Sequence, residues 1–257
     1  MHRRRPKTLR RYVLPALLAL SVGACQGSER SAPAPTEPRP AVGLMTSLPI
    51  YWGEPDEMGD LLDGSVKPHR VRILLEERYQ VLPLDILGTP EGSVTGELQQ
   101  LRRVMVVQPR ALTPADNVAL DRWVRAGGRV LLVLDPMMTD HSAYPVGDKR
   151  RYNDVALVPP ILNRWGLALS YREGAPPRQV PFGGAEVPVD EYGTLSVANS
   201  SVEAPCRIEA DGVIARCRIG NGVALIVADA AFLNGGGDKE ADRAVEAVTA
   251  AIFEGSN

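Results

Sequence analysis

The sequence has few residues of the kinds on which many enzyme active sites depend. Its 257 residues include three histidines and three cysteines, and aromatic residues make up only 5% of the chain. A metal site with three histidine ligands is excluded beyond the N-terminal region, because only His69 and His141 lie there. A mixed histidine and carboxylate site stays open. No G-x-S-x-G nucleophile elbow is present. These absences argue against nucleophilic catalysis and against a histidine-rich metal centre.

Charge is distributed unevenly along the chain. Of the 29 basic residues, six lie within residues 1–11, and the remaining 23 are outnumbered by 31 acidic residues. The body of the protein is therefore acidic, which argues against nucleic acid as a partner.

The N-terminus has the features of a secretory signal. Residues 1–11 are basic, Tyr12–Leu20 is a short apolar core, and Ser21-Val22-Gly23-Ala24-Cys25 follows. The last five residues resemble a bacterial lipobox, which implies lipidation of Cys25 and a signal peptide at residues 1–24. An ordinary signal peptide with a cysteine near its cleavage site is the alternative. Gln26 in place of aspartate implies a lipoprotein of the outer rather than the inner membrane, facing the periplasm.

A proline- and serine-rich stretch, residues 25–40, separates this signal from the rest of the chain. It has no apolar periodicity, so we expect an extended tether that reaches up to about 45 Å. Residues 41–257 are then expected to form one α/β domain. No repeat and no apolar run long enough to span a bilayer appears in them.

Residues 103–136 predict a β-α-β unit around which the domain is built. Val104–Val107 and Val130–Leu134 are short apolar runs suited to parallel strands buried on both faces. Between them, Thr113-Pro114 and Asp116 form the start of a helix with a capping box, and Gly127-Gly128 ends it. This unit favours a single, doubly wound, mostly parallel sheet.

The rest of the domain is predicted from similar local patterns. Strands are expected at Ala41–Ile50, Val81–Leu87, Leu167–Tyr171 and Val223–Ala228, and helices at His69–Arg78, Glu97–Arg102, Asp154–Trp165 and Lys239–Phe253. Residues 172–219 predict a small insertion of antiparallel β-structure that ends in a hairpin.

Cys206 and Cys217 flank a hairpin signal. Asp211-Gly212 predicts a type I′ turn, which places Cys206 opposite Cys217 and Ile208 opposite Ala215. Directly opposed cysteines in an antiparallel pair lie within disulfide range. We favour a structural disulfide over free thiols. A metal site is disfavoured because no histidine is near.

Polar residues follow the expected parallel strands and are candidates for ligand binding. Ligands of open parallel sheets sit beyond the carboxyl ends of the strands. The candidates there are Thr46, Ser47, Gln108, Asp135 and Asp229, with His141 in the long polar loop 137–153. Asp135 and Asp229 could act as acid and base, but capping of the following segments is the favoured role. The acids at residues 54–63 lack the EF-hand spacing of a calcium site.

Three segments resemble a known family. LTPADNVALDRWVRAGGRVLLVLDP, LNRWGLAL and GNGVALIVADAAFLN are similar to the soluble domain of ABC-type transport auxiliary proteins, of the gliding-motility and DUF4350-like type. The resemblance implies a flavodoxin-like or class I glutamine-amidotransferase-like fold without amidotransferase chemistry. Members usually carry a transmembrane anchor and a longer body, whereas this chain has a lipoprotein-type signal.

These observations lead to one expected function and one alternative. We expect a lipid-anchored envelope protein that binds or scaffolds, auxiliary to an ABC-type transport system, with no enzymatic activity, cofactor or metal. The partners expected are the membrane, through the lipid on Cys25, and an envelope or transporter protein. The alternative is a periplasmic hydrolase that uses Asp135, Asp229 and His141 at the carboxyl edge of the sheet.

Overall fold

The computed structural model describes residues 38–55, 66–171, 173–198, 205–234 and 236–255. The predicted signal peptide, the lipidated Cys25, nearly all of the tether and the acids at residues 56–63 lie outside these residues. The chain divides into two compact units, Met1–Pro38 and Arg39–Asn257, and the second contains all the described helices and strands.

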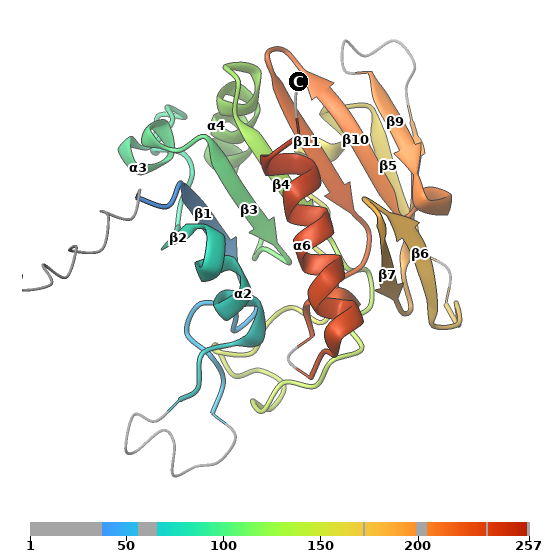
Figure 1. Ribbon diagram of the computed structural model, residues 1–257. Helices are drawn as coiled ribbons and strands as arrows, with labels where there is room; N and C mark the ends of the chain where they lie inside the picture. Colours follow the sequence, from blue (N-terminus) through green and yellow to red (C-terminus); the bar gives the residue numbers. More distant parts are fainter. Residues whose placement is uncertain (1–37, 56–65, 172, 199–204, 235, 256–257) are drawn as a thin grey trace, which may run out of the picture. The chain divides into compact units, whose positions relative to one another are not determined.

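A seven-stranded sheet forms the centre of the second unit (Figure 1). The strand order is β2-β1-β3-β4-β11-β10-β9. The first five of these strands run parallel, while β10 is antiparallel to both of its neighbours. The predicted α/β class with a mostly parallel sheet is confirmed. In chain order the bounds are β1 Ala41–Thr46, β2 Gln80–Pro83, β3 Arg103–Val107, β4 Arg129–Val133, β9 Cys206–Glu209, β10 Ile214–Ile219 and β11 Gly222–Val227.

The predicted β-α-β unit is present as β3, α4 (Pro114–Arg125) and β4. β3 and β4 are parallel neighbours, and Val104 pairs with Val130. The Thr113 hydroxyl accepts from the backbone N–H of Asp116, and the Asp116 carboxylate accepts from the backbone N–H of Thr113. Gly127 follows the helix with a φ of 115°, a conformation that favours glycine.

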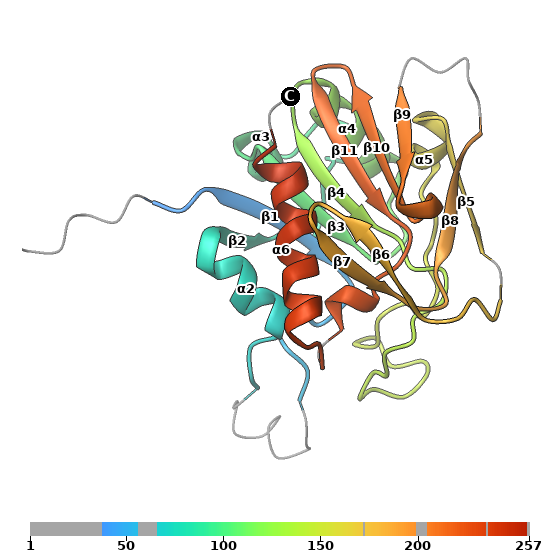
Figure 2. The ribbon, with the colours of Figure 1, turned by 45° about the vertical axis from the view of Figure 1, so that its right-hand side comes forward.

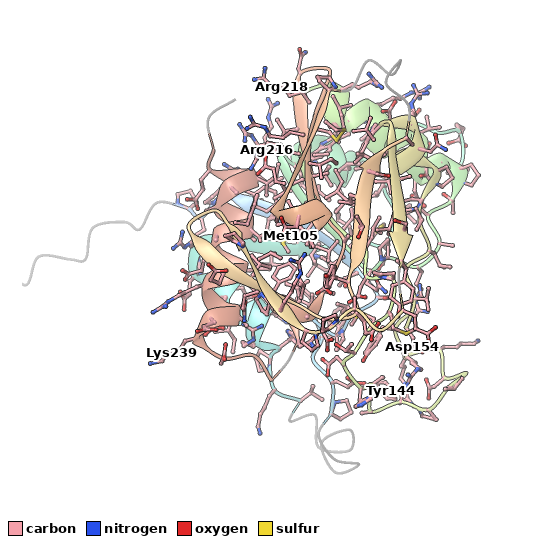
Figure 3. The ribbon with its side chains drawn as sticks, turned by 90° about the vertical axis from the view of Figure 1, so that its right-hand side faces the viewer. Met105, Tyr144, Asp154, Arg216, Arg218 and Lys239 are labelled. Carbon is pink, nitrogen blue, oxygen red and sulfur yellow. A yellow bond between two sulfur atoms is a disulfide. The ribbon has the colours of Figure 1, made fainter. Side chains whose placement is uncertain are left out.

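Helices cover both faces of the sheet (Figures 1 and 2). α2 (Arg70–Arg78) and α6 (Lys239–Phe253) cover one face, and α3 (Gly96–Gln100), α4 and α5 (Pro160–Arg164) cover the other. Met105, which lies in the middle of the sheet (Figure 3), packs toward α6, while its neighbours Val104 and Val106 pack toward α4. Side chains on both faces of β3 are apolar because the strand is buried on both faces. Each buried apolar side chain stabilises the fold by about 1.5–3 kcal/mol.

The segment between β4 and β9 forms two small antiparallel sheets. β5 (Leu167–Tyr171) pairs with β8 (Gly193–Val197), and β6 (Arg178–Phe182) pairs with β7 (Ala185–Val189). The sequence suggested that the β9–β10 hairpin belongs to this insertion, and that prediction is wrong. The hairpin is part of the central sheet, because β10 pairs with β11.

The hairpin has the predicted register. Cys206 pairs with Cys217 and Ile208 with Ala215, and the two cysteines form a disulfide. Asp211 and Gly212 have φ values of 52° and 92°, and the N–H of Val213 donates to the carbonyl of Ala210, as in a type I′ turn. Pairing stops one residue earlier than a two-residue turn requires, because Ala210 is also left-handed.

Prolines shorten two of the predicted elements. The helix expected at Asp154–Trp165 is only Pro160–Arg164, because Pro159 and Pro160 each disfavour the helical conformation in the residue before them. The strand expected at Val81–Leu87 ends at Pro83, which has no N–H to donate. β1 likewise ends at Thr46 rather than Ile50, where the chain turns at Ser47 and Leu48.

Candidate functional site

Gln108 connects the segments that leave the carboxyl edge of the sheet. Its side-chain amide donates to the carbonyls of Asp135 (3.0 Å) and Asn153 (3.1 Å), and its Oε1 accepts from the N–H of Asp135. Its own carbonyl accepts from the Ser47 hydroxyl. Gln108 is fully buried and has a φ of 40°, which is uncommon for a residue with a side chain. Its polar atoms are used to hold the protein together.

Thr46 has a similar local role, since its hydroxyl accepts from the N–H of Leu48 at 2.9 Å. Thr46 and Ser47 therefore shape the turn after β1. Each side chain has a hydrogen-bond partner within the protein.

Asp135 and Asp229 follow β4 and β11 and are almost completely buried. The carboxylate of Asp135 accepts from the N–H groups of Met137 (2.8 Å) and Ala230 (3.0 Å). The carboxylate of Asp229 accepts from the N–H groups of Ala231 (2.6 Å) and Asp190 (3.0 Å). All four carboxylate oxygens therefore bind backbone amides that follow the strands or lie in the insertion, which is the capping arrangement favoured from the sequence.

The two carboxyls also influence each other's ionisation. Burial raises the pKa of Asp135 to about 6, and the hydrogen bonds from Met137 and Ala230 oppose that rise. Burial raises the pKa of Asp229 well above its ordinary value, and the charge of Asp135 adds to the rise. Raised pKa values can mark catalytic acids, but here the oxygens face the backbone rather than an open space.

A cavity of about 580 Å³ lies among the segments that leave the carboxyl edge of the sheet. Its apolar walls include Leu48, Ile73, Leu74, Met138 and Leu233, which come from the segments after β1, β4 and β11 and from α2. Its size suits a small-molecule ligand. Asp135 and Asp229 do not line it, and neither forms a hydrogen bond with His141 in the part of the chain described.

The polar groups of this cavity come from α2, from the segment before it, from the loop after β4, from the segment after β11 and from α6. They are Glu54, Lys67, His69, Arg70, Asp140, His141, Tyr152, Asn234 and Asp242. Of the residues proposed from the sequence as ligand-binding, only His141 is among them. His141 is exposed, and its backbone N–H donates to Asp140.

Tyr152 is the residue of the cavity with an unmet hydrogen-bonding capacity. It is 5% exposed, and its buried hydroxyl has no hydrogen-bond partner among the described residues. Burial raises its pKa, so the hydroxyl is protonated at neutral pH and can donate as well as accept. An unpartnered buried hydroxyl costs about 1–3 kcal/mol, which a ligand that bonds to it would recover.

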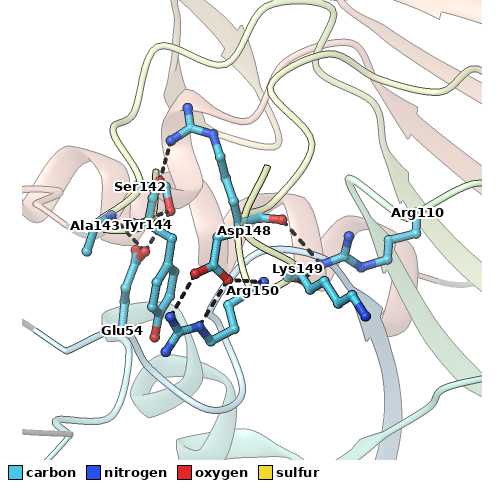
Figure 4. Close-up of polar contacts among 9 residues, drawn as sticks. Glu54, Arg110, Ser142, Ala143, Tyr144, Asp148, Lys149 and Arg150 are labelled. Atoms are coloured by element: carbon cyan, nitrogen blue, oxygen red, sulfur yellow. Dashed lines mark hydrogen bonds and ion pairs between the residues drawn. The ribbon is translucent and has the colours of Figure 1, made fainter. Parts of the chain in front are cut away.

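The loop that carries Tyr152 is held in place by several hydrogen bonds. Glu54 accepts from the hydroxyl and the N–H of the consecutive residues Ser142 and Ala143, both at 2.8 Å (Figure 4). Arg110 donates to the carbonyl of Lys149 at 2.7 Å. These contacts, with Gln108 bound to Asn153, hold the middle and the C-terminal end of the loop.

His69 adds a second polar group of defined protonation. Its Nδ1 accepts from the N–H of Val71, so Nε2 carries the proton of the neutral ring. Burial and the charge of Arg70 lower the pKa of His69, so the ring is neutral at pH 7. Arg70 itself is bound to Asp242 and to the carbonyls of Phe232 and Asn234.

Sequence reasoning identified neither Tyr152 nor His69 as a site residue. Tyr152 lies in a loop without periodicity, so nothing in the sequence indicates that its ring is buried. His69 stands just before an apolar helical pattern, and its N-cap position was the one available signal.

A second hollow, of about 650 Å³, lies between α4 and α5. Its buried acid, Asp121, accepts from Trp165 Nε1 (3.0 Å) and from Arg125 and Arg164. This carboxylate is satisfied within the protein, and it ties α5 to α4. The hollow is therefore a weaker candidate than the cavity that contains Tyr152.

Metal-binding clusters and membrane-spanning helices are both absent from the described residues. These residues contain no group of three or more histidine, cysteine or acidic side chains placed to hold a metal ion. No helix in these ranges is both long and apolar enough to cross a bilayer.

Comparison with known proteins gives only distant structural similarity. No family model and no curated protein matches the sequence. An exo-β-1,4-mannosidase from an Opitutaceae bacterium is similar with a TM-score of 0.47 and 14% identity, over 84% of this chain and 36% of that one. A β-galactosidase from Rahnella sp. R3 has a TM-score of 0.46 and 12% identity, over 83% of this chain and 31% of that one.

A ThuA-like protein from Parabacteroides merdae is matched over most of both chains, 86% of this one and 93% of that one, with a TM-score of 0.34 and 12% identity. By contrast, this chain spans about a third of the two glycosidases. Identities and TM-scores this low do not transfer an activity from these proteins to this chain.

Proposed function

We propose that this protein is a lipid-anchored binding protein of the cell envelope that holds a small ligand in the cavity at the carboxyl edge of its sheet. The observation that carries the proposal is the unpartnered buried hydroxyl of Tyr152, a residue that lines that cavity. His69, which also lines the cavity, has a second donor in its Nε2–H. Both groups are neutral at pH 7, and the charged residues that line the cavity are of both signs: Glu54, Asp140 and Asp242 are acidic, and Lys67 and Arg70 are basic. The ligand is therefore a small, uncharged molecule with hydroxyl or carbonyl oxygens and an apolar part.

Anchoring follows from the signal sequence. Lipidation of Cys25 would hold the protein on the outer membrane, facing the periplasm, where a ligand-binding domain could serve an ABC-type transport system. The order of the five parallel strands, β2-β1-β3-β4-β11, supports a flavodoxin-like arrangement of the kind implied by the transport auxiliary family.

A hydrolase that uses Asp135 and Asp229 is the second candidate, and the raised pKa values of the two acids are the observation in its favour. The binding function is preferred because all four carboxylate oxygens accept backbone hydrogen bonds. Hydrolysis of an ester, amide or glycoside probe that disappears in Asp229→Asn, with the fold intact, would favour the hydrolase.

Ligand binding can be tested by incubating the mature protein with the small-molecule fraction of an envelope extract and identifying retained compounds by mass spectrometry. We expect retention that is at least tenfold weaker in Tyr152→Phe, because the buried hydroxyl no longer pairs with the ligand. Tyr171→Phe is the matched control, since the hydroxyl of Tyr171 is bound to Glu191 outside the cavity. Equal retention by the two variants would contradict the site, and lack of any retained compound would contradict the function.

Anchoring has a separate test. Cys25→Ser should release the protein from membranes, and intact mass should show a lipid on the wild type alone. A Cys25→Ser variant that stays on membranes through washing at high salt would contradict lipidation.

A further inference from the structure

The amino edge of the central sheet is rich in arginine. Because β1, β2, β3, β4 and β11 are parallel, all of them begin at this edge. Arg103 and Arg129 are the first residues of β3 and β4 and pair with each other in register. Arg39, Arg102, Arg207 and Arg218, which we call the amino-edge arginines, surround them.

The amino-edge arginines are available to a partner. All four are exposed, and none of their side chains forms a hydrogen bond or an ion pair within the described part of the chain. Arg129 at this edge is already engaged, since it donates to the carbonyl of Ile252 at the end of α6. The acid Glu254 is bound to Tyr79 and lies 3.5 Å from Arg78.

The opposite end of the domain has a different character. Figure 3 shows Arg216 and Arg218 at one end and Tyr144, Asp154 and Lys239 toward the other. The carboxyl edge holds Asp135, Asp140 and Asp229, together with the cavity. Unpaired positive charge thus gathers at one end of a chain whose body is acidic overall.

The path of the chain indicates which partner this charge meets. Arg39 is the first residue of the domain unit and leads into β1 at Ala41, so the chain before it reaches the domain at the amino edge. The residues before it are the proposed tether and the proposed lipid site at Cys25. A tether of about 15 residues would keep this edge within about 45 Å of the membrane.

We propose that the amino-edge arginines bind the anionic phospholipid headgroups of the membrane to which the protein is anchored. Guanidinium groups pair well with phosphate, and each basic residue close to an anionic surface strengthens attachment. The contact would orient the domain with the carboxyl-edge cavity away from the membrane. This inference rests on the proposed anchoring for its geometry, but headgroup binding itself can be measured without the lipid.

The test uses the mature chain from residue 25 with Cys25→Ser, so the result does not depend on acylation. Binding is measured by co-sedimentation with vesicles of phosphatidylcholine alone or with about one third phosphatidylglycerol. We expect binding to the anionic vesicles only, and its loss when salt rises from about 0.05 M to about 0.5 M. The triple variant Arg102→Glu, Arg207→Glu and Arg218→Glu should bind the anionic vesicles about tenfold more weakly or worse.

A matched control separates the position of the charge from its amount. Lys149→Glu, Arg150→Glu and Lys239→Glu reverse three exposed charges away from the amino edge and should leave binding unchanged. Circular dichroism of both triple variants verifies that they are folded. Equal weakening by both variants, or no binding to anionic vesicles, would overturn the proposal. Vesicles prepared from the cell envelope, which still contain membrane proteins, give a further comparison. If the protein binds only these vesicles, and no longer binds them after they are treated with protease, the partner is an acidic protein and the proposal is overturned.

Discussion

At the scale of single residues, the buried polar groups at the carboxyl edge fall into two kinds. Gln108, Asp135 and Asp229 have their side-chain oxygens bonded to backbone amides, so they serve the fold. Tyr152 is buried to a similar degree, yet its hydroxyl has no partner in the described residues. Because burying an unpaired polar group is costly, the difference separates the residues that build the edge from the residue placed to meet a ligand.

The raised pKa values of Asp135 and Asp229 predict an unusual pH dependence of stability. As the pH rises above about 4, these carboxyls lose their protons in the unfolded chain. In the folded chain Asp135 keeps its proton until about pH 6, and the pKa of Asp229 is also raised well above its ordinary value. The folded state therefore binds more protons, and the free energy of unfolding falls over this window, by about 3 kcal/mol for Asp135. Burial alone would raise the pKa values of Asp116 and Asp121, but hydrogen bonds lower them below the ordinary value. The stability that these two ionised carboxylates contribute is therefore lost only at more acidic pH.

Urea unfolding at a series of pH values measures this dependence. We expect stability to decline from about pH 4 to pH 6, and the decline to become shallower in Asp135→Asn, which cannot ionise. Stability that rises across this window in the wild type would show that the two carboxyls are not protonated in the folded state.

Gln108 offers a second prediction at this scale. Gln108→Ala removes three side-chain hydrogen bonds and leaves the N–H of Asp135 without its partner, so the free energy of unfolding should fall by about 2–4 kcal/mol. Gln99→Ala is the matched control: the Gln99 amide is exposed and bonds only to the carbonyl of Val94, so its loss should cost less than about 1 kcal/mol. Similar losses in the two variants would rule out the connecting role of Gln108.

At the scale of elements, the sequence predicted helix boundaries and hairpin register correctly where several local signals occurred together. Thr113, Pro114 and Asp116 stand at the spacing of a capping box, and α4 begins as they indicate. The cysteine pairing followed from turn chemistry, because Asp211-Gly212 fixes the register of the hairpin. The position of that hairpin in the central sheet was not predictable, since pairing of β10 with β11 depends on tertiary contacts.

The disulfide gives a prediction for this element. It closes a short loop, with a separation of 11 residues, so Cys206→Ser with Cys217→Ser should lower the free energy of unfolding by about 2–4 kcal/mol. A reductant should produce the same loss in the wild type and none in the variant. Hydrogen exchange should increase in β9 and β10 more than in β3 and β4, which lie further into the sheet. Thiol alkylation of both cysteines in the unfolded, unreduced protein would contradict the pairing.

At the scale of the whole domain, the parallel sheet separates two surfaces. The carboxyl ends of the strands, with the loop after β4, form the cavity, and the amino ends present the arginines. The class of fold could be predicted from Val104–Val107 and Val130–Leu134, because strands buried on both faces need helices above and below. The cavity could not, because Tyr152 is brought to it by a long loop that Gln108 and Glu54 hold in place.

The central claim is that an anchored domain holds a ligand in the cavity beside Tyr152. Native mass spectrometry of the protein extracted from envelopes in mild detergent tests it most directly. The account predicts a lipid on residue 25 and one bound small molecule, which is lost in Leu74→Trp because the indole fills the cavity, but is kept in Val118→Trp on α4. A wild-type protein that carries no small molecule, or a molecule retained equally by Leu74→Trp, would contradict the account.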